Sequence, residues 1–75
     1  MKRLDRVDKK RNAAKLHRII QACMAEEDFK ITFGLLLDYK NKGYIFNTDY
    51  TTLSKELNDR LETLIIEGVI PESQH

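Results

Sequence analysis

The chain is poor in residues that cross-link or interrupt a fold: its 75 residues include one cysteine, one proline, three glycines and no tryptophan. Because Cys23 is the only cysteine, no disulfide can form within the chain, and we expect a reducing compartment, most simply the cytoplasm. No uninterrupted apolar run approaches the roughly 20 residues that a membrane-spanning helix needs, and no apolar signal segment follows the charged N-terminus. We therefore expect no membrane association.

The chain also lacks the patterns of common catalytic and metal sites. His17 and His75 are the only histidines, and neither has a cysteine or a second histidine at ligand spacing, so we expect no bound metal. No glycine-rich phosphate loop or nucleophile elbow occurs. The carboxylates of residues 26–28 form a cluster, but acid–base catalysis needs a concave pocket, which a domain of this size rarely has. We predict no enzymatic activity, no cofactor and no small-molecule substrate.

The charge of the chain is divided unevenly along its length. The formal net charge is +1. Residues 1–18 hold eight lysines and arginines against two aspartates, a net +6, whereas residues 19–75 carry a net −5. A polyanion would therefore be contacted by the basic end and not by the whole surface. The alternative is that these charges only keep the N-terminal segment solvated.

The clearest periodic pattern lies at residues 51–70, where leucine and isoleucine recur at helical spacing. These apolar residues fall within a stripe about 120° wide, as in an amphipathic helix. They are Leu53, Leu57, Leu61, Leu64 and Ile65. Asp49, Thr51 or Thr52 is predicted to cap the first turn through a side-chain oxygen. Gly68 is predicted to take the left-handed position that ends the helix.

Ile66 breaks this pattern, because it lies on the far side of the helix from the stripe, beside Lys55, Asp59 and Glu62. We expect a second surface, from this chain or from a partner, to cover it. We therefore predict that Ile66 is an interface residue, and that a homodimer would supply its partner.

The N-terminal third predicts a second amphipathic helix, at residues 8–25. Its core face carries Ala13, Leu16, Ile19, Ile20, Cys23 and Met24. This pattern has the spacing of a core-facing helix. Residues 1–7 are predicted to be a basic flexible lead-in and residues 72–75 a polar tail. Residues 8–71 then form a single helical domain.

The middle of the chain allows two interpretations. Residues 29–33 alternate apolar and polar side chains, which fits a short strand with Thr32 capping the helix that follows, or the first turn of that helix. A helix of two to three turns is predicted at residues 34–41 and ends before Gly43. Residues 47–49 have turn composition.

Three amphipathic helices with short connections predict a mainly α fold, a compact three-helix bundle with at most short β segments. The large core fillers are expected to be Phe29, Phe33 and Phe46. At residues 61–70 the chain carries Leu61, Leu64, Gly68, Val69 and Ile70, a spacing similar to the end of the last helix in winged-helix domains. The order of elements likewise resembles a helix-turn-helix domain of the winged-helix type.

Two features depart from the winged-helix pattern. Only five residues follow Ile70, which leaves no room for the wing hairpin, and the last helix has a net charge of −2. The resemblance implies a dimeric, transcription-regulating DNA-binding protein that contacts phosphates mainly through its basic N-terminal helix. The candidate nucleic-acid-binding residues are Lys2, Arg3, Arg6, Lys9, Lys10, Arg11, Lys15, Arg18, Ser54, Lys55 and Asn58.

A second resemblance favours a different function. Residues 30–36 contain Lys30, Ile31, Thr32, Phe33, Gly34 and Leu36, a stretch similar to one in the Costars domain of small actin-regulatory proteins. This resemblance implies a protein–protein interaction module, such as an adaptor, an inhibitor or a cytoskeletal regulator, that does not bind nucleic acid. The sequence leaves the DNA-binding and protein-binding interpretations open.

Overall fold

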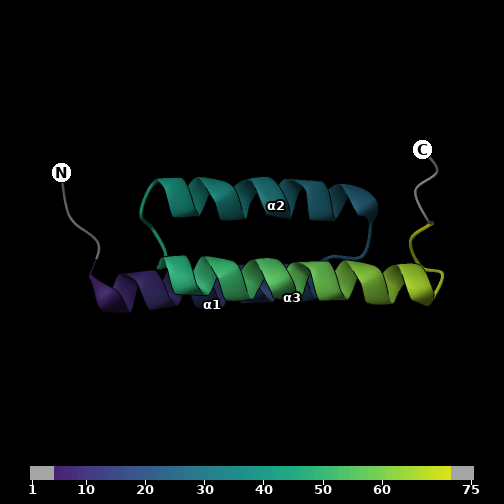
Figure 1. The fold of residues 1–75 in the computed structure, drawn as a ribbon, viewed down its shortest axis with the longest axis horizontal. Helices are drawn as coiled ribbons and strands as arrows, with labels where there is room; N and C mark the ends of the chain where they lie inside the picture. The colour runs from purple at the N-terminus through teal and green to yellow at the C-terminus, as the bar shows by residue number, and fades with distance from the viewer. Residues whose placement is uncertain (1–4, 72–75) are drawn as a thin grey trace.

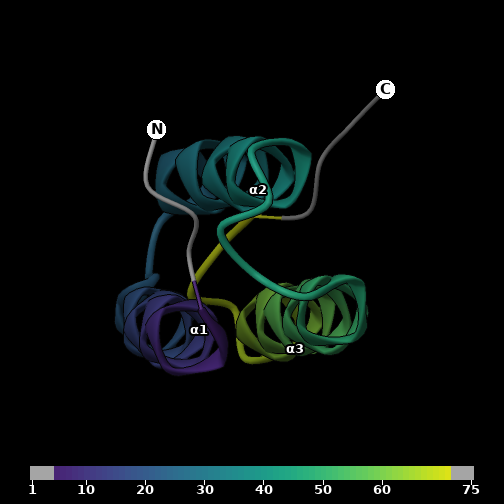
Figure 2. The same ribbon diagram turned by 90° about the vertical axis from the view of Figure 1, so that its left-hand side faces the viewer.

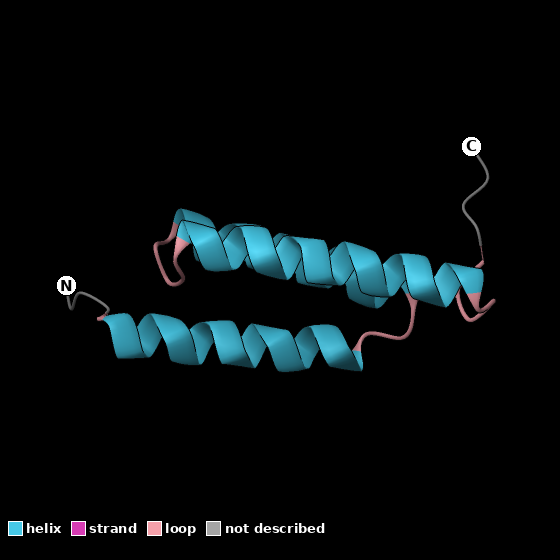
Figure 3. Ribbon diagram, turned by 60° about the horizontal axis from the view of Figure 1, so that its bottom comes forward, coloured by secondary structure: helices cyan, strands magenta, loops and turns pink. Residues whose placement is uncertain are grey.

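The structure, a computed structural model, describes residues 5–71 and shows three helices. They are α1 (Arg6–Ala22), α2 (Glu26–Asn41) and α3 (Asn47–Ile66). Successive helices run in opposite directions and lie side by side along one long axis (Figures 1 and 3). The described part of the chain contains no strand, so the predicted mainly α, three-helix fold is confirmed.

Helix α1 begins earlier and ends earlier than predicted. Asp5 is its N-cap, and the Asp5 Oδ1 atom accepts a hydrogen bond from the backbone N–H of Asp8 at 2.9 Å. The helix stops at Ala22, and Cys23 has an extended backbone with ψ 127°. The predicted boundaries at residues 8 and 25 were therefore wrong. The end of the predicted lead-in belongs to the helix, while residues 1–4 and 72–75 lie outside the described residues.

The early end of α1 explains an error in the predicted core. Met24 was assigned to the core face of α1, but its side chain is 51% exposed. Because Met24 follows the helix and lies in the connection to α2, helical spacing no longer determines its direction. The Met24 sulfur instead accepts a hydrogen bond from the Arg60 side chain on α3 at 3.3 Å.

Helix α2 resolves the ambiguity at residues 29–33 in favour of helix. It starts at Glu26, and it buries Phe29, Thr32 and Leu36 at spacings of three and four residues. The Thr32 hydroxyl donates to the backbone carbonyl of Asp28 at 2.7 Å, so Thr32 lies within the helix and does not cap it. The strand interpretation was wrong because the alternation covers too few residues to distinguish a period of 2 from one of 3.6.

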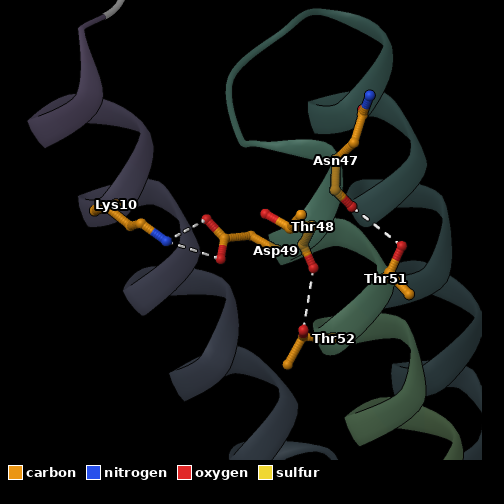
Figure 4. A network of polar contacts seen from close by, with 6 residues as sticks. All are labelled: Lys10, Asn47, Thr48, Asp49, Thr51 and Thr52. Atoms are coloured by element: carbon orange, nitrogen blue, oxygen red, sulfur yellow. Dashed lines mark hydrogen bonds and ion pairs between the residues drawn. The ribbon is translucent and has the colours of Figure 1, made fainter.

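Helix α3 starts at Asn47, so the predicted turn at residues 47–49 is its first helical turn. Phe46 is the N-cap, and it makes no side-chain capping bond. The hydroxyls of Thr51 and Thr52 donate backwards to the carbonyls of Asn47 and Thr48 at 3.1 and 3.0 Å (Figure 4). These threonines are therefore inside the helix, and their predicted capping role was wrong.

The end of α3 matches the prediction more closely. Helical geometry stops at Ile66, and Gly68 adopts a positive φ of 80°. This left-handed conformation is one that glycine adopts without a steric cost. The backbone N–H groups of Val69 and Ile70 then donate to the carbonyl of Leu64 at 2.9 and 3.2 Å, which turns the chain back across the end of the bundle. Ile70 is buried there.

Viewed along the long axis, the three helices stand at the corners of a triangle (Figure 2). The principal extents are 44 × 20 × 17 Å, and the N-terminal turns of α1 project beyond the loop that joins α2 to α3 (Figure 1). Helix-turn-helix pairs typically cross at about 90–120°, whereas α2 and α3 run nearly antiparallel (Figure 1). The winged-helix resemblance therefore stays a prediction based on element order.

The core lies along the axis of the triangle and is formed by all three helices, the two connections between them and the segment that follows α3. Its buried apolar residues are Leu16, Ile20, Cys23, Phe29, Leu36, Ile45, Leu53, Leu57, Leu64 and Ile70. Leu61 and Ile65 of the predicted α3 stripe are half-buried against this core, as are Phe33 and Ile19. The α3 stripe was thus predicted correctly.

We expect Leu57→Ala to lower the free energy of unfolding by about 2–5 kcal/mol, because it leaves a cavity beside a fully buried side chain. Chemical denaturation followed by circular dichroism measures this loss. Ile66→Ala on the same helix is the control, since Ile66 is 79% exposed and its truncation should change stability by no more than about 0.5 kcal/mol. Equal losses for the two variants would contradict the placement of the core.

Candidate nucleic-acid interface

The basic residues of α1 divide into two groups, of which the first faces α3. The Lys10 ammonium lies 3.0 and 3.1 Å from the two carboxylate oxygens of Asp49, at the start of α3 (Figure 4). The Nζ atoms of Lys9 and Lys10 also lie 4.9 and 5.5 Å from the centre of the Phe46 ring, within the range of cation–π attraction. Both lysines are therefore engaged in holding α1 against the start of α3.

The second group forms what we call the basic row, which consists of Arg11, Lys15 and Arg18 on the outer side of α1. The spacings of four and three residues bring these side chains to one side of the helix over two turns. All three are exposed, and none of them forms an ion pair with another of residues 5–71. Arg6, at the start of the same helix, is also exposed.

A series of polar contacts between α1 and α3, which we call the polar seam, separates the basic row from the acidic face of α3. His17 and Gln21 of α1 both contact the Glu56 carboxylate. Near the other end, the Arg60 Nε–H donates to the backbone carbonyl of Cys23 at 3.0 Å. Together with the Lys10–Asp49 ion pair, these contacts occupy polar groups along the inner edges of both helices.

The structure does not bring the predicted α3 residues to the basic row. Glu56 marks the side of α3 that faces α1. Ser54 and Asn58 are each two residues from Glu56, about 200° around the helix, and therefore lie on the side turned away from α1. Lys55 and Asn58 are exposed, while Ser54 is half-buried. Lys2 and Arg3 lie outside the described residues.

The exposed face of α3 is acidic, as its sequence indicated. Asp59, Glu62 and Glu67 are all exposed, against the single exposed Lys55. Ile66 is also on this face, and it is 79% exposed, so no other part of residues 5–71 supplies the covering surface that was predicted for it. Its neighbours one turn earlier, Glu62 and Thr63, are exposed polar residues. No continuous apolar surface therefore surrounds Ile66 on α3.

Sequence reasoning missed a shallow hollow of about 270 Å³ between the C-terminal end of α1 and the N-terminal half of α2. Its lining is Ile19, Ala22, Cys23, Asp28, Ile31 and Thr32. Ile31 is 63% exposed beside this hollow. Reading residues 29–33 as a possible strand concealed the site, because only a helix places Ile31 opposite Ile19.

Polar groups at the floor and rim of the hollow are bonded within the protein. The Cys23 Sγ and the Thr32 Oγ1 lie 3.3 Å apart, and the buried Cys23 thiol also lies 3.3 Å from the carbonyl of Ile19. The Asp28 carboxylate accepts hydrogen bonds from the backbone N–H groups of Met24 and Ala25, both at 3.1 Å. The two bonds stabilise the charged carboxylate and so lower the pKa of Asp28 below its ordinary value of 3.8. The bond from Met24 has the larger effect, and that from Ala25 comes second.

The Asp28 bonds determine where α1 gives way to α2. Ala25 is the N-cap of α2, and its side chain has no oxygen with which to accept a bond. Asp28, in the first turn, instead binds back to the two amides that precede the helix, and its negative charge lies at the favourable end of the helix dipole. The two bonds therefore fix the backbone of the connection between α1 and α2, which borders the hollow.

No group of three or more histidine, cysteine, aspartate or glutamate side chains among residues 5–71 is arranged to hold a metal ion. None of the three helices is both long enough and apolar enough to cross a membrane. Comparison of the chain with protein families, curated proteins and solved structures finds no match.

The Asp28 bonds predict a pH dependence of stability. An aspartate with a lowered folded-state pKa stabilises the fold above its ordinary, unfolded-state pKa of 3.8, and loses that contribution as the pH falls through the folded-state pKa. We expect the melting temperature of the natural protein to exceed that of Asp28→Asn at pH 6. The difference should shrink as the pH falls through the folded-state pKa of Asp28, because the carboxylate then takes up a proton and loses its charge.

The control for this comparison is Glu62→Gln, which changes an exposed carboxylate with no hydrogen bond to another described residue. Its melting temperature should follow that of the natural protein across the whole range. A constant difference between Asp28→Asn and the natural protein as the pH falls through the folded-state pKa of Asp28 would show that the carboxylate charge does not stabilise this connection.

Proposed function

We propose that this protein is a small DNA-binding regulatory protein that contacts the phosphate backbone through the outer side of α1. The observation that supports the proposal most directly is the basic row, because Arg11, Lys15 and Arg18 are exposed on one side of α1 and form no ion pair with another of residues 5–71. A cluster of exposed cations at helical spacing matches the electrostatic requirement of a polyphosphate chain.

The distribution of the other charges also favours the outer side of α1 as the phosphate-binding surface. The exposed acidic side chains of the helices lie on α3, at Asp59 and Glu62, and on α2, at Glu26, Glu27, Asp28 and Asp38, whereas Asp8 is the one acidic residue within α1. Arg6 extends the positive surface toward the projecting N-terminal end of α1 (Figure 1). Lys10 contributes less, since Asp49 already neutralises it.

Contacts of this kind position a protein on DNA without reading its sequence. Asn58 and Lys55 on α3 would lie away from a duplex centred on the basic row. We therefore propose phosphate binding by α1 as the primary interaction, with little discrimination among sequences by α3. A cytoplasmic location is part of this proposal, because Cys23 is a free thiol, as is usual in a reducing compartment.

Fluorescence anisotropy of a labelled mixed-sequence duplex tests the proposal, with the protein titrated at about 20 and 150 mM salt. We expect binding that weakens steeply as salt is added. The triple variant Arg11→Ala, Lys15→Ala and Arg18→Ala should bind about tenfold or more weakly at low salt. The slope of log affinity against log salt should become less steep by up to about 2.7, because each phosphate contact contributes about 0.9.

The matched control removes three positive charges elsewhere, through Lys30→Ala, Lys40→Ala and Lys55→Ala. These lysines are exposed on α2 and α3, so the control has the same net charge as the row variant. It should retain most of the affinity and the salt slope. The proposal fails if the natural protein does not bind at low salt, or if both triple variants lose affinity equally.

A second candidate function is that of a protein–protein interaction module. The observation that favours it is the apolar hollow between α1 and α2, with Ile31 largely exposed at its edge. Such a hollow offers an apolar surface on which a side chain of a protein partner could dock. If the natural protein does not bind DNA at low salt, the hollow between α1 and α2 becomes the main candidate binding site, and the second function is favoured.

A further inference from the structure

Met24 is the one methionine among residues 5–71, and it lies in the connection between α1 and α2, beside the second half of α3. Its side chain is 51% exposed. Helix α3 places Arg60 next to it, and the Nη2 group of Arg60 donates a hydrogen bond to the Met24 sulfur at 3.3 Å. The sulfur is therefore accessible to solvent and in contact with a charged donor.

A second bond fixes the Arg60 side chain in this position. Its Nε–H donates to the backbone carbonyl of Cys23 at 3.0 Å, at the C-terminal end of α1. The helix dipole favours a cation at this end of a helix. Arg60 is half-buried and forms no ion pair with another of residues 5–71, so its charge has no carboxylate partner in this part of the chain.

The Met24 thioether is a poor acceptor for this donor. A thioether sulfur accepts hydrogen bonds weakly, whereas a guanidinium forms its strong bonds with oxygen acceptors. The bond from Arg60 to Met24 therefore uses little of the capacity of the guanidinium. An oxygen atom attached to the same sulfur would be a stronger acceptor at the same place, and the exposure of Met24 leaves room for it.

We propose that Met24 is a site of oxidation by hydrogen peroxide, and that Arg60 binds the methionine sulfoxide that forms. The sulfur attacks one peroxide oxygen, a sulfur–oxygen bond forms and the O–O bond breaks. The hydroxide that leaves takes the proton of the transferred oxygen and becomes water. The sulfur is oxidised by two electrons and the peroxide is reduced by two. This proposal concerns the protein alone and does not depend on DNA binding.

Oxidation at this position should stabilise the fold. Methionine oxidation usually disrupts a core, because it converts an apolar side chain into a polar one. Met24 lies outside the core, and its new oxygen meets the Arg60 guanidinium, so the sulfoxide strengthens the contact between the end of α1 and α3. The adjacent Cys23 thiol is only 3% exposed, so peroxide should react with Met24 first.

Thermal unfolding followed by circular dichroism tests the proposal, with the full chain measured before and after treatment with dilute hydrogen peroxide. Mass spectrometry of the tryptic peptide of residues 19–30 locates the added oxygen, because its fragment ions separate Met24 from Cys23. We expect the oxygen on Met24, an intact Cys23 thiol and a melting temperature raised by about 4 °C or more. Oxidation of Cys23 before Met24, or a lower melting temperature, overturns the proposal.

Met24→Leu is the matched control for the peroxide treatment. It keeps a similar apolar volume and leaves Met1 as the only methionine that peroxide can oxidise. Its melting temperature should be the same before and after treatment. A rise equal to that of the natural protein would contradict the role of Met24.

Arg60→Ala tests the partner of the sulfoxide. This variant loses the bond to the Cys23 carbonyl, so the quantity compared is the change in melting temperature on oxidation, measured within each protein. Oxidation should raise the melting temperature of the natural protein but not that of Arg60→Ala. Equal rises would show that Arg60 does not bind the sulfoxide.

Met24→Gln tests the same contact without oxidation and in the presence of Arg60. Glutamine is also unbranched, and its amide carbonyl supplies an oxygen acceptor near the position of the sulfur. Met24→Gln should therefore melt at a higher temperature than Met24→Leu. If the two variants melt at the same temperature, an oxygen acceptor at this position gains nothing from Arg60 and the proposal is wrong.

Discussion

The structure depends on the burial of one apolar stripe, that of α3, between the other two helices. Leu53, Leu57 and Leu64 fill the axis of the triangle, where they meet Leu16 and its neighbours from α1 and α2. A single helix of this composition would be marginal in water, because most of the stability of a helix in a protein comes from packing its apolar face. The connections, the seam and the surface charges are all arranged around this contact.

Once the helices pack in this way, the charged residues are divided by their position around each helix. The side of α1 toward α3 places Lys10 and His17 against Asp49 and Glu56, whereas the outer side leaves Arg11 and Arg18 facing solvent. The division is a result of geometry and not of composition, since basic residues occur around most of α1. It separates cations that stabilise the bundle from cations that remain for a polyanion.

The sequence predicted which end of the chain carries the basic residues, but not which of these residues pair with α3 and which stay exposed. The unequal charge of the two parts of the chain indicated a basic surface near the N-terminus. Sequence alone could not show that Lys10 would be neutralised, because its partner Asp49 is 39 residues away along the chain. It also grouped Ser54 and Asn58 with the α1 cations, although packing turns these two residues away from them.

Local patterns in the sequence were enough to predict that the chain is a helical bundle, which face of α3 is buried, and that Gly68 ends the last helix. These features follow from local periodicity and from the backbone freedom of single residues, which neighbouring residues suffice to reveal. The packing of the helices was needed to show that residues 29–33 are helical, that Met24 is exposed, and that Ile19 and Ile31 share a hollow. Those outcomes depend on which helices meet and at what height, and that is decided by contacts between residues far apart in the chain.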